Sequence, residues 1–157
     1  MVKKISWNDY LAVNKYLLQL LLDNPYKYYK QLESYRKTFG IQFIKKVINI
    51  NTYEIYCGNH LHALVMITGN LVYSTSDEKK TIWGINKSLS DSVALKICKR
   101  LLEYGVDYNY LNYYNENPYQ SCIDNSAYTS RYNNKLLKRK LRDKMIKDLN
   151  QKFEFMV

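Results

Sequence analysis

The stretch from Leu101 to Pro118 constrains the fold more than any other part of the 157-residue sequence. Leu101 and Leu102 stand at the end of an apolar, helix-like run, and Gly105 follows where a left-handed residue would end that helix. Asp107 has a side chain of the kind that hydrogen-bonds the backbone of a turn. Pro118 suits the first position of a new helix, where its missing N–H needs no partner. The stretch therefore predicts a helix, an ordered turn and the start of a second helix.

Leu101–Asn109 resembles the second helix and outgoing turn of an ankyrin repeat, for which the family pattern is Leu-Leu-x-x-Gly-Ala-Asp-x-Asn. Asn112 stands at the polar position of the family's hairpin. Asn115 stands where the family usually has Gly, an exchange that the left-handed region permits. Asn117-Pro118-Tyr119 resembles the Thr-Pro-Leu that opens the next repeat. The resemblance implies an all-α fold, an ankyrin-repeat-like helical solenoid of about three or four repeats whose terminal repeats are degenerate.

A second, weaker copy of the pattern lies upstream. Gly58-Asn59-His60-Leu61-His62-Ala63 resembles the Gly-x-Thr-Pro-Leu-His opening of a repeat, although it is one residue short and has no Pro. Gly58 and Asn115 are 57 positions apart, whereas the usual period is about 33. The excess falls in residues 68–91, which we interpret as one long insertion between the two helices of a repeat. Stretched repeats of this kind resemble those of poxvirus and giant-virus ankyrin proteins.

One domain over residues 1–157 accommodates this interpretation. It divides into degenerate N-terminal helices at 1–57, the recognisable repeats with their insertion at 58–123, and a C-terminal capping region with a basic helix at 124–157. Only five Gly and two Pro residues argue against a sandwich of many strands and tight turns. The apolar spacing instead predicts helices from Ser6 or Asn8 to Asp23, and over 26–37, 41–48, 60–67, 92–104, 118–124 and 135–153.

The last of these helices combines an apolar stripe with a basic run. The stripe consists of Leu137, Leu141, Met145 and Leu149, each four residues after the one before. The run, Lys138-Arg139-Lys140-Leu141-Arg142, fits a nuclear-import signal or a nucleic-acid patch. We favour the solvated face of a capping helix, because a terminal repeat must turn a polar surface to water.

The net charge of +10 leaves a different class of function open. Such a charge attracts nucleic acid, anionic membranes or acidic proteins. Most of the basic residues are Lys, however, and abundant Lys, Asn, Ile and Tyr are also what AT-rich coding produces. Proteins that read nucleic acid rely more on Arg for bidentate contacts. A small basic helical protein that binds nucleic acid is therefore the alternative to a protein-binding module.

Residues that commonly carry catalysis or bind metals are sparse. His60 and His62 are the only two histidines and no third ligand accompanies them, so we favour a role in the turn over a metal site. Cys57, Cys98 and Cys122 form no CxxC pair and indicate a reducing compartment. The sequence supports neither a nucleophile–histidine pairing nor a glycine-rich phosphate loop. We expect no catalytic residue, no metal and no cofactor.

The expected binding face follows from the resemblance. In ankyrin proteins the hairpin tips and the first helices form a concave face that binds other proteins, and Tyr suits such interfaces because it offers a large area at low entropy cost. The resemblance to viral proteins further implies a host regulatory protein as partner and interference with host signalling or defence. It also implies a location in the host-cell cytoplasm, or in the nucleus if the basic run acts as an import signal. No apolar segment is long enough to span a membrane, so we expect no membrane insertion. The candidate contact residues are Tyr108, Tyr110, Tyr113, Tyr114, Asn59 and His60.

Overall fold

The computed structural model describes residues 4–51, 58–69, 90–122 and 132–156. These residues are helical apart from caps, loops and one isolated bridge residue, Gly58, and they contain no strand. The expected all-α class is therefore confirmed for this part of the chain. Residues 70–89, most of the interpreted insertion, lie outside the described residues. Within the described ranges, no helix is both long and apolar enough to cross a membrane.

Three consecutive helices form the N-terminal part: α1 (Trp7–Asp23), α2 (Pro25–Phe39) and α3 (Ile41–Ile48). Ser6 and Asp9 begin α1 with a capping box, in which the side chain of each accepts a hydrogen bond from the backbone N–H of the other. The Asn24 side chain caps α2 by accepting from the N–H of Lys27, and Pro25 occupies the first position of that helix. Local sequence signals thus account for both helix starts.

The rest of the described chain forms α4 (His60–Gly69), α5 (Asp91–Glu103), a short helical segment at 118–122 and α7 (Tyr132–Met156). The hydroxyl of Ser90 caps α5 by accepting from the N–H of Val93. The sequence ends the fourth helix at residue 67, but Thr68 and Gly69 belong to α4 rather than to the insertion. The Thr68 hydroxyl donates to the carbonyl of Val65, one turn back, so this buried polar group is satisfied within the helix.

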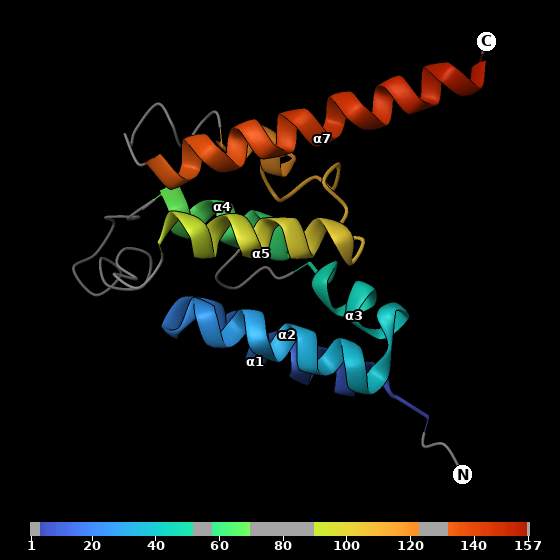
Figure 1. Ribbon diagram of the computed structural model, residues 1–157. Helices are drawn as coiled ribbons and strands as arrows, with labels where there is room; N and C mark the ends of the chain where they lie inside the picture. The colour runs from blue at the N-terminus through green and yellow to red at the C-terminus, as the bar shows by residue number, and fades with distance from the viewer. Residues whose placement is uncertain (1–3, 52–57, 70–89, 123–131, 157) are drawn as a thin grey trace.

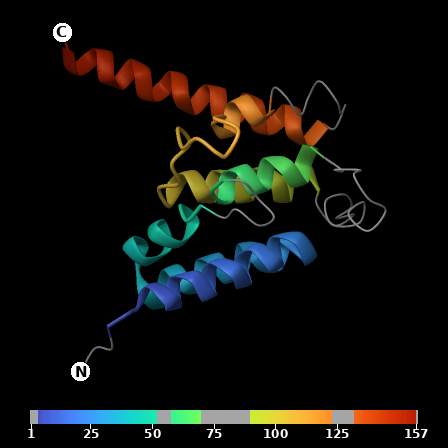
Figure 2. The same ribbon diagram turned by 180° about the vertical axis from the view of Figure 1, so that it is seen from behind.

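Figure 1 shows the helices in three tiers, and Figure 2 shows the same order from behind. α1 and α2 lie side by side in the first tier, α4 and α5 form the second, and α7 lies on the third. α1 contacts α4, α2 contacts α5, and α7 contacts both α4 and α5. The middle tier is therefore covered from both sides, which explains why residues 60–68 of α4 are buried on every face.

Arg100 of α5 joins the first two tiers. Its guanidinium forms a 2.7 Å ion pair with Glu33 of α2 and donates to the hydroxyl of Tyr29, also of α2, at 2.6 Å. The same group lies over the rings of Tyr29 and Tyr104, at 5.3 and 5.7 Å from their centroids. A second ion pair, to Glu103 at 3.2 Å, keeps the guanidinium in place. One side chain thus connects α2 and α5 by several contacts of different kinds.

α7 is only partly covered by the tiers. Leu137 and Leu141 are fully buried, but Ile146 and Leu149 are 49% and 53% exposed. The expected apolar stripe is therefore buried at its N-terminal end alone. Figures 1 and 2 agree that the C-terminal half of α7 extends past the ends of α4 and α5. The sequence could not predict which part of the stripe is buried, because the spacing of apolar residues is the same whether or not another helix packs against them.

Candidate binding surface

α5 ends in the way that the sequence predicts. Gly105 has a φ of 89°, in the left-handed region. Its N–H donates to the carbonyl of Leu102 at 3.2 Å, and the N–H of Val106 donates to the carbonyl of Leu101 at 2.9 Å. These paired bonds are the Schellman pattern of a helix C-terminus. A Cβ at residue 105 would lie 3.1 Å from the side chain of Lys45, so both φ and space favour glycine.

The loop that follows, residues 106–117, is held by its own hydrogen bonds. The Asn112 side-chain oxygen accepts from the N–H groups of Tyr114 and Glu116 at 2.9 and 3.0 Å. Asn115 has a φ of 60°, as expected for an Asn that replaces Gly in the left-handed region. The loop therefore has a defined backbone shape without belonging to a sheet.

The loop leads directly into the helical segment at 118–122. Asn117 and Gln120 cap this segment reciprocally, because the backbone N–H of each donates to the side-chain oxygen of the other, at 2.9 and 2.8 Å. Pro118 occupies the first helical position, as the sequence predicts.

Asn49 and Asn59 attach the start of the loop to an earlier part of the chain. Asn49, just after α3, donates to the carbonyl of Gly105 at 3.1 Å and accepts from the N–H of Asp107 at 2.7 Å. Asn59, just before α4, donates to the carbonyl of Asp107 at 2.8 Å and caps α4 through the N–H of Leu61 at 3.1 Å. Asn59 is 1% exposed. This corrects its assignment as a contact residue, because its polar atoms are already used inside the molecule.

His62 fastens the other end of the loop, and its ring hydrogen-bonds the turn as expected. Its Nε2 lies 2.9 Å from the carbonyl of Glu116 and its Nδ1 lies 3.2 Å from the N–H of Asn59. A carbonyl only accepts, so the contact to Glu116 places a proton on Nε2, while Nδ1 also lies 3.0 Å from the side-chain oxygen of Asn59. Burial lowers the pKa of His62 to about 4. A side chain at Gly58 would collide with this ring, so glycine is required there for close approach.

His60 belongs to a buried polar cluster rather than to a binding face. Its Nε2 donates to the side-chain oxygen of Asn14 in α1 at 2.6 Å, and its Nδ1 accepts from the hydroxyl of Tyr28 in α2 at 2.8 Å. All three side chains are buried, and burial lowers the pKa of His60 to about 3. His60 therefore links α4 to both helices of the first tier. The expectation that it contacts a partner is corrected, since its ring is fully enclosed.

Two of the four loop tyrosines have roles within the fold. Tyr108 is half-buried, and its hydroxyl donates to the carboxylate of Asp148 in α7. Burial, and then this bond, raise the pKa of Tyr108 to about 12. Tyr110 lies edge-on to the ring of His62, with the ring centroids 6.3 Å apart. Both tyrosines hold the loop against its neighbours.

The other two tyrosines extend into solvent. Tyr113 and Tyr114 are 71% and 57% exposed, and their rings meet edge-on with centroids 5.4 Å apart. Leu111, which the sequence analysis did not single out, is 53% exposed beside them along the chain. We refer to Leu111, Tyr113 and Tyr114 as the loop-tip surface. An apolar residue between polar ones at the tip of a turn is the signal that would have identified Leu111.

The basic run of α7 does not form one patch. Successive helical residues are rotated by about 100°, which separates Lys140 from Lys138 and Arg142 by nearly half a turn. Lys140 instead shares a face with Lys144 and Lys147, toward α5. Arg139 and Arg142 are exposed, and Lys138 is half-buried. Four basic residues within a run of five therefore point in several different directions in the structure.

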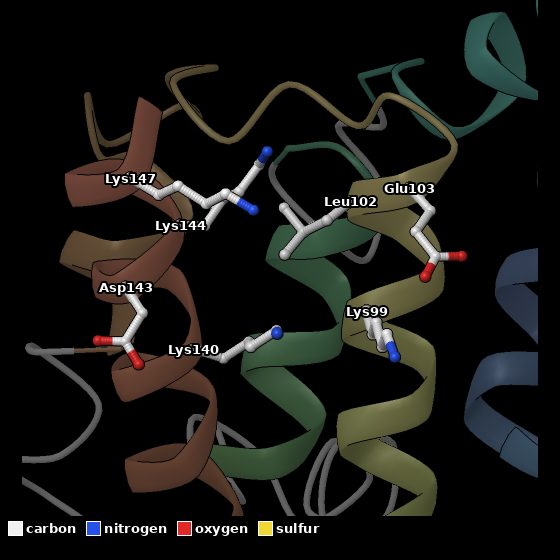
Figure 3. Close-up of a pocket in the computed structure, with 7 residues that line it drawn as sticks. All are labelled: Lys99, Leu102, Glu103, Lys140, Asp143, Lys144 and Lys147. Atoms are coloured by element: carbon white, nitrogen blue, oxygen red, sulfur yellow. The ribbon is translucent and has the colours of Figure 1, made fainter. Parts of the chain in front are cut away.

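A groove of about 280 Å³ lies between α5 and α7, and Figure 3 shows the side chains around it. Lys99 of α5 and Lys140, Lys144 and Lys147 of α7 contribute its cations, and Leu102 contributes an apolar side chain. The spacing of the three α7 lysines, at i, i+4 and i+7, can be read from the sequence. The position of Lys99 opposite them cannot, because it depends on how two helices distant in the sequence pack.

The histidines and the described cysteines are all buried. Burial raises the pKa of Cys98 to about 12 and also raises the pKa of Cys122. Thiols with a raised pKa stay protonated and are poor nucleophiles. Cys57 lies outside the described residues. The described ranges contain no group of three His, Cys, Asp or Glu side chains placed to bind a metal ion.

Neither models of known protein families, nor curated proteins, nor solved structures gave a match to this chain.

Proposed function

We propose that the chain is a non-catalytic, ankyrin-repeat-like module that binds another protein through the loop-tip surface. The observation that carries the proposal is the exposure of Leu111, Tyr113 and Tyr114 on a loop whose backbone is fixed by hydrogen bonds. Exposed aromatic side chains on a rigid support bind with little loss of conformational entropy. Monomeric proteins rarely leave such residues together without a use.

Further support comes from the turn positions that carry the ankyrin resemblance. Gly105 and Asn115 have the left-handed backbone that the family pattern requires, and His62 bonds the adjoining turn. The resemblance to viral ankyrin proteins extends the proposal to a host regulatory protein as partner, with interference in host signalling or defence as the effect. The proposed site of action is the cytoplasm of the host cell.

The test is recovery of a partner from a host-cell extract by the wild type and by two double variants. Tyr113→Ala/Tyr114→Ala should lose the partner. Tyr16→Ala/Tyr26→Ala removes two tyrosines that are also exposed, on α1 and α2, and should retain it. If the loop-tip variant recovers the same protein as the wild type, the loop-tip surface is not the binding site.

Nucleic-acid binding is the second candidate, and the net charge of +10 is the observation that favours it. A protein that neutralises phosphates releases counterions, so its affinity for random DNA or RNA falls steeply with added salt. Titration of labelled random DNA and RNA at low and moderate salt tests this candidate. Absence of binding at low salt would exclude it.

A further inference from the structure

The groove between α5 and α7 carries positive charge that the fold does not neutralise. Lys144 forms an ion pair with Asp148 at 3.1 Å. Lys99, Lys140 and Lys147 form no ion pair in the described part of the chain. Bringing like charges together on facing helices opposes folding unless another group offsets the repulsion. Such an arrangement is typical of a surface that receives a negatively charged ligand.

The groove also has an apolar element, and its carboxylates are directed elsewhere. In Figure 3, Leu102 and the three α7 lysines point into the gap between the helices, whereas Glu103 and Asp143 point away from it. Glu103 is already paired with Arg100 on the far side of α5. The α7 lysines therefore border an apolar contact point, Lys99 lies on the α5 side of it, and carboxylates lie at both rims.

We propose that this groove binds an acidic segment of the partner protein, in which carboxylates flank one apolar side chain. The inference rests on the proposed protein-binding function and names the chemistry of the partner. The carboxylates pair with Lys99, Lys140 and Lys147, and the apolar side chain packs on Leu102 and on the aliphatic stems of the lysines. The volume lies below the range of about 300–1,000 Å³ usual for small-molecule pockets, which favours a segment that fills the groove with one or two side chains.

The rims favour a peptide over nucleic acid. A phosphate backbone carries a charge at every nucleotide, so a strand that runs beyond the gap meets Asp143 and Glu103. A peptide can place uncharged residues opposite these carboxylates. Among the described residues, none of those that line the groove is an arginine, the side chain that binds phosphate in a bidentate manner.

The experiment uses the full chain and a fluorescent peptide of about twelve residues in which Glu and Asp flank a single Leu. Anisotropy titrations compare the wild type with Lys99→Glu/Lys140→Glu and with Lys15→Glu/Lys27→Glu. The second variant has the same net charge but changes exposed lysines of α1 and α2. We expect the groove variant to bind about tenfold more weakly or worse, and the control to stay within about twofold of wild type. Replacing the peptide's Leu by Ser should also weaken binding to the wild type.

Equal losses in the two double variants would overturn the proposal, because they would show attraction to net charge alone. A single-stranded oligonucleotide of similar length that binds as tightly as the peptide, and that loses affinity through the groove variant, would overturn it in favour of nucleic acid. Circular dichroism of each variant checks that it is folded; if Lys99→Glu/Lys140→Glu unfolds, Lys99→Gln/Lys147→Gln gives the same test with a smaller change.

Failure of this inference can be told apart from failure of the proposed function. If an extract yields a partner that depends on Tyr113 and Tyr114 but not on Lys99 and Lys140, the groove inference fails and the proposed function stands. If the peptide binds through the groove but the loop-tip variant recovers everything that the wild type does, the loop-tip surface fails as the binding site.

Discussion

Burial lowers the pKa of both His60 and His62. Nε2 of each ring donates to an oxygen, from Asn14 or Glu116, and Nδ1 of His60 accepts from the hydroxyl of Tyr28. Protonation of either ring would place a charge in a buried site, and in His60 it would also break the bond from Tyr28. We expect that neither imidazole titrates between pH 8 and pH 5. Because the chain has only two histidines, their ring proton NMR signals can be followed without ambiguity, and a midpoint near pH 6.5 for either would contradict the structure.

The same groups make stability depend on pH, in a direction that follows from their lowered pKa values. In the unfolded chain both histidines take up protons as the pH falls through about 6.5, whereas in the folded chain they do so only near 4 and 3. The unfolded state therefore binds more protons below pH 6.5, and stability falls as the pH is lowered. We expect each histidine to account for about 2 kcal/mol of the free energy of unfolding lost between pH 7 and pH 5. Urea unfolding at several pH values measures this; a flat profile over that interval would contradict it.

Gly105 and Asn115 provide a paired test of the turn geometry. Gly105→Ala introduces a Cβ at φ 89° and 3.1 Å from the Lys45 side chain, so we expect a loss of about 1–2 kcal/mol in the free energy of unfolding. Asn115→Gly places a glycine where the backbone is already left-handed, a conformation that glycine adopts without strain. It should change the free energy of unfolding by less than about 0.5 kcal/mol. Urea denaturation compares the two. Equal effects would mean that the end of α5 does not need a left-handed residue.

α7 is the element whose two halves differ most in their surroundings. Leu137→Ala, at a fully buried position, should lower the free energy of unfolding by about 2–5 kcal/mol. Leu149→Ala makes the same chemical change in the same helix at a position that is 53% exposed, and should change it by less than about 0.5 kcal/mol. Thermal and urea unfolding measure both. A large effect at Leu149 would contradict its exposure, because it would mean that another part of the same chain packs on the C-terminal half of α7.

Sequence reasoning succeeded where an element is determined by its own residues. The bounds Ile41–Ile48 agree with the expected third helix, and Ser90, Gly105 and Pro118 end or begin helices as predicted. Caps and left-handed residues act over a few positions, so neighbouring letters suffice to detect them. The exposure of Leu149 depends instead on where α4 and α5 end in space, which no local pattern records.

At the scale of the whole molecule, the tiers are connected by few polar side chains, and Arg100 is the most heavily used of those described. Arg100→Gln removes the ion pair to Glu33 and the bond to Tyr29, which join α5 to α2. The group is 30% exposed, so water screens part of the effect and we expect a loss of about 1 kcal/mol. Lys96→Gln, an exposed position on the same helix, is the control and should have no measurable effect. Urea unfolding that fails to separate the two variants would show that the cluster contributes nothing.

The candidate site could be predicted only in part because it is assembled from distant segments. Tyr113 and Tyr114 were identified because they lie in a turn that the sequence already indicates. Asn59 and His60 were assigned to the binding face because the ankyrin resemblance places the start of a first helix there, but both are buried. The Asn59 side chain hydrogen-bonds Asp107, and the His60 ring hydrogen-bonds Asn14 and Tyr28, all of which belong to other segments. The groove required α5 and α7 to be placed side by side before Lys99 could be recognised as part of it.

The enclosure of His60 and His62 has a consequence for the electrostatics of the molecule. Histidine is the side chain that normally gains charge between pH 8 and pH 5. With both rings kept neutral, the folded chain gains no charge from its histidines when the surroundings become mildly acidic. Histidine protonation therefore leaves the positive potential of the groove lysines unchanged over this range.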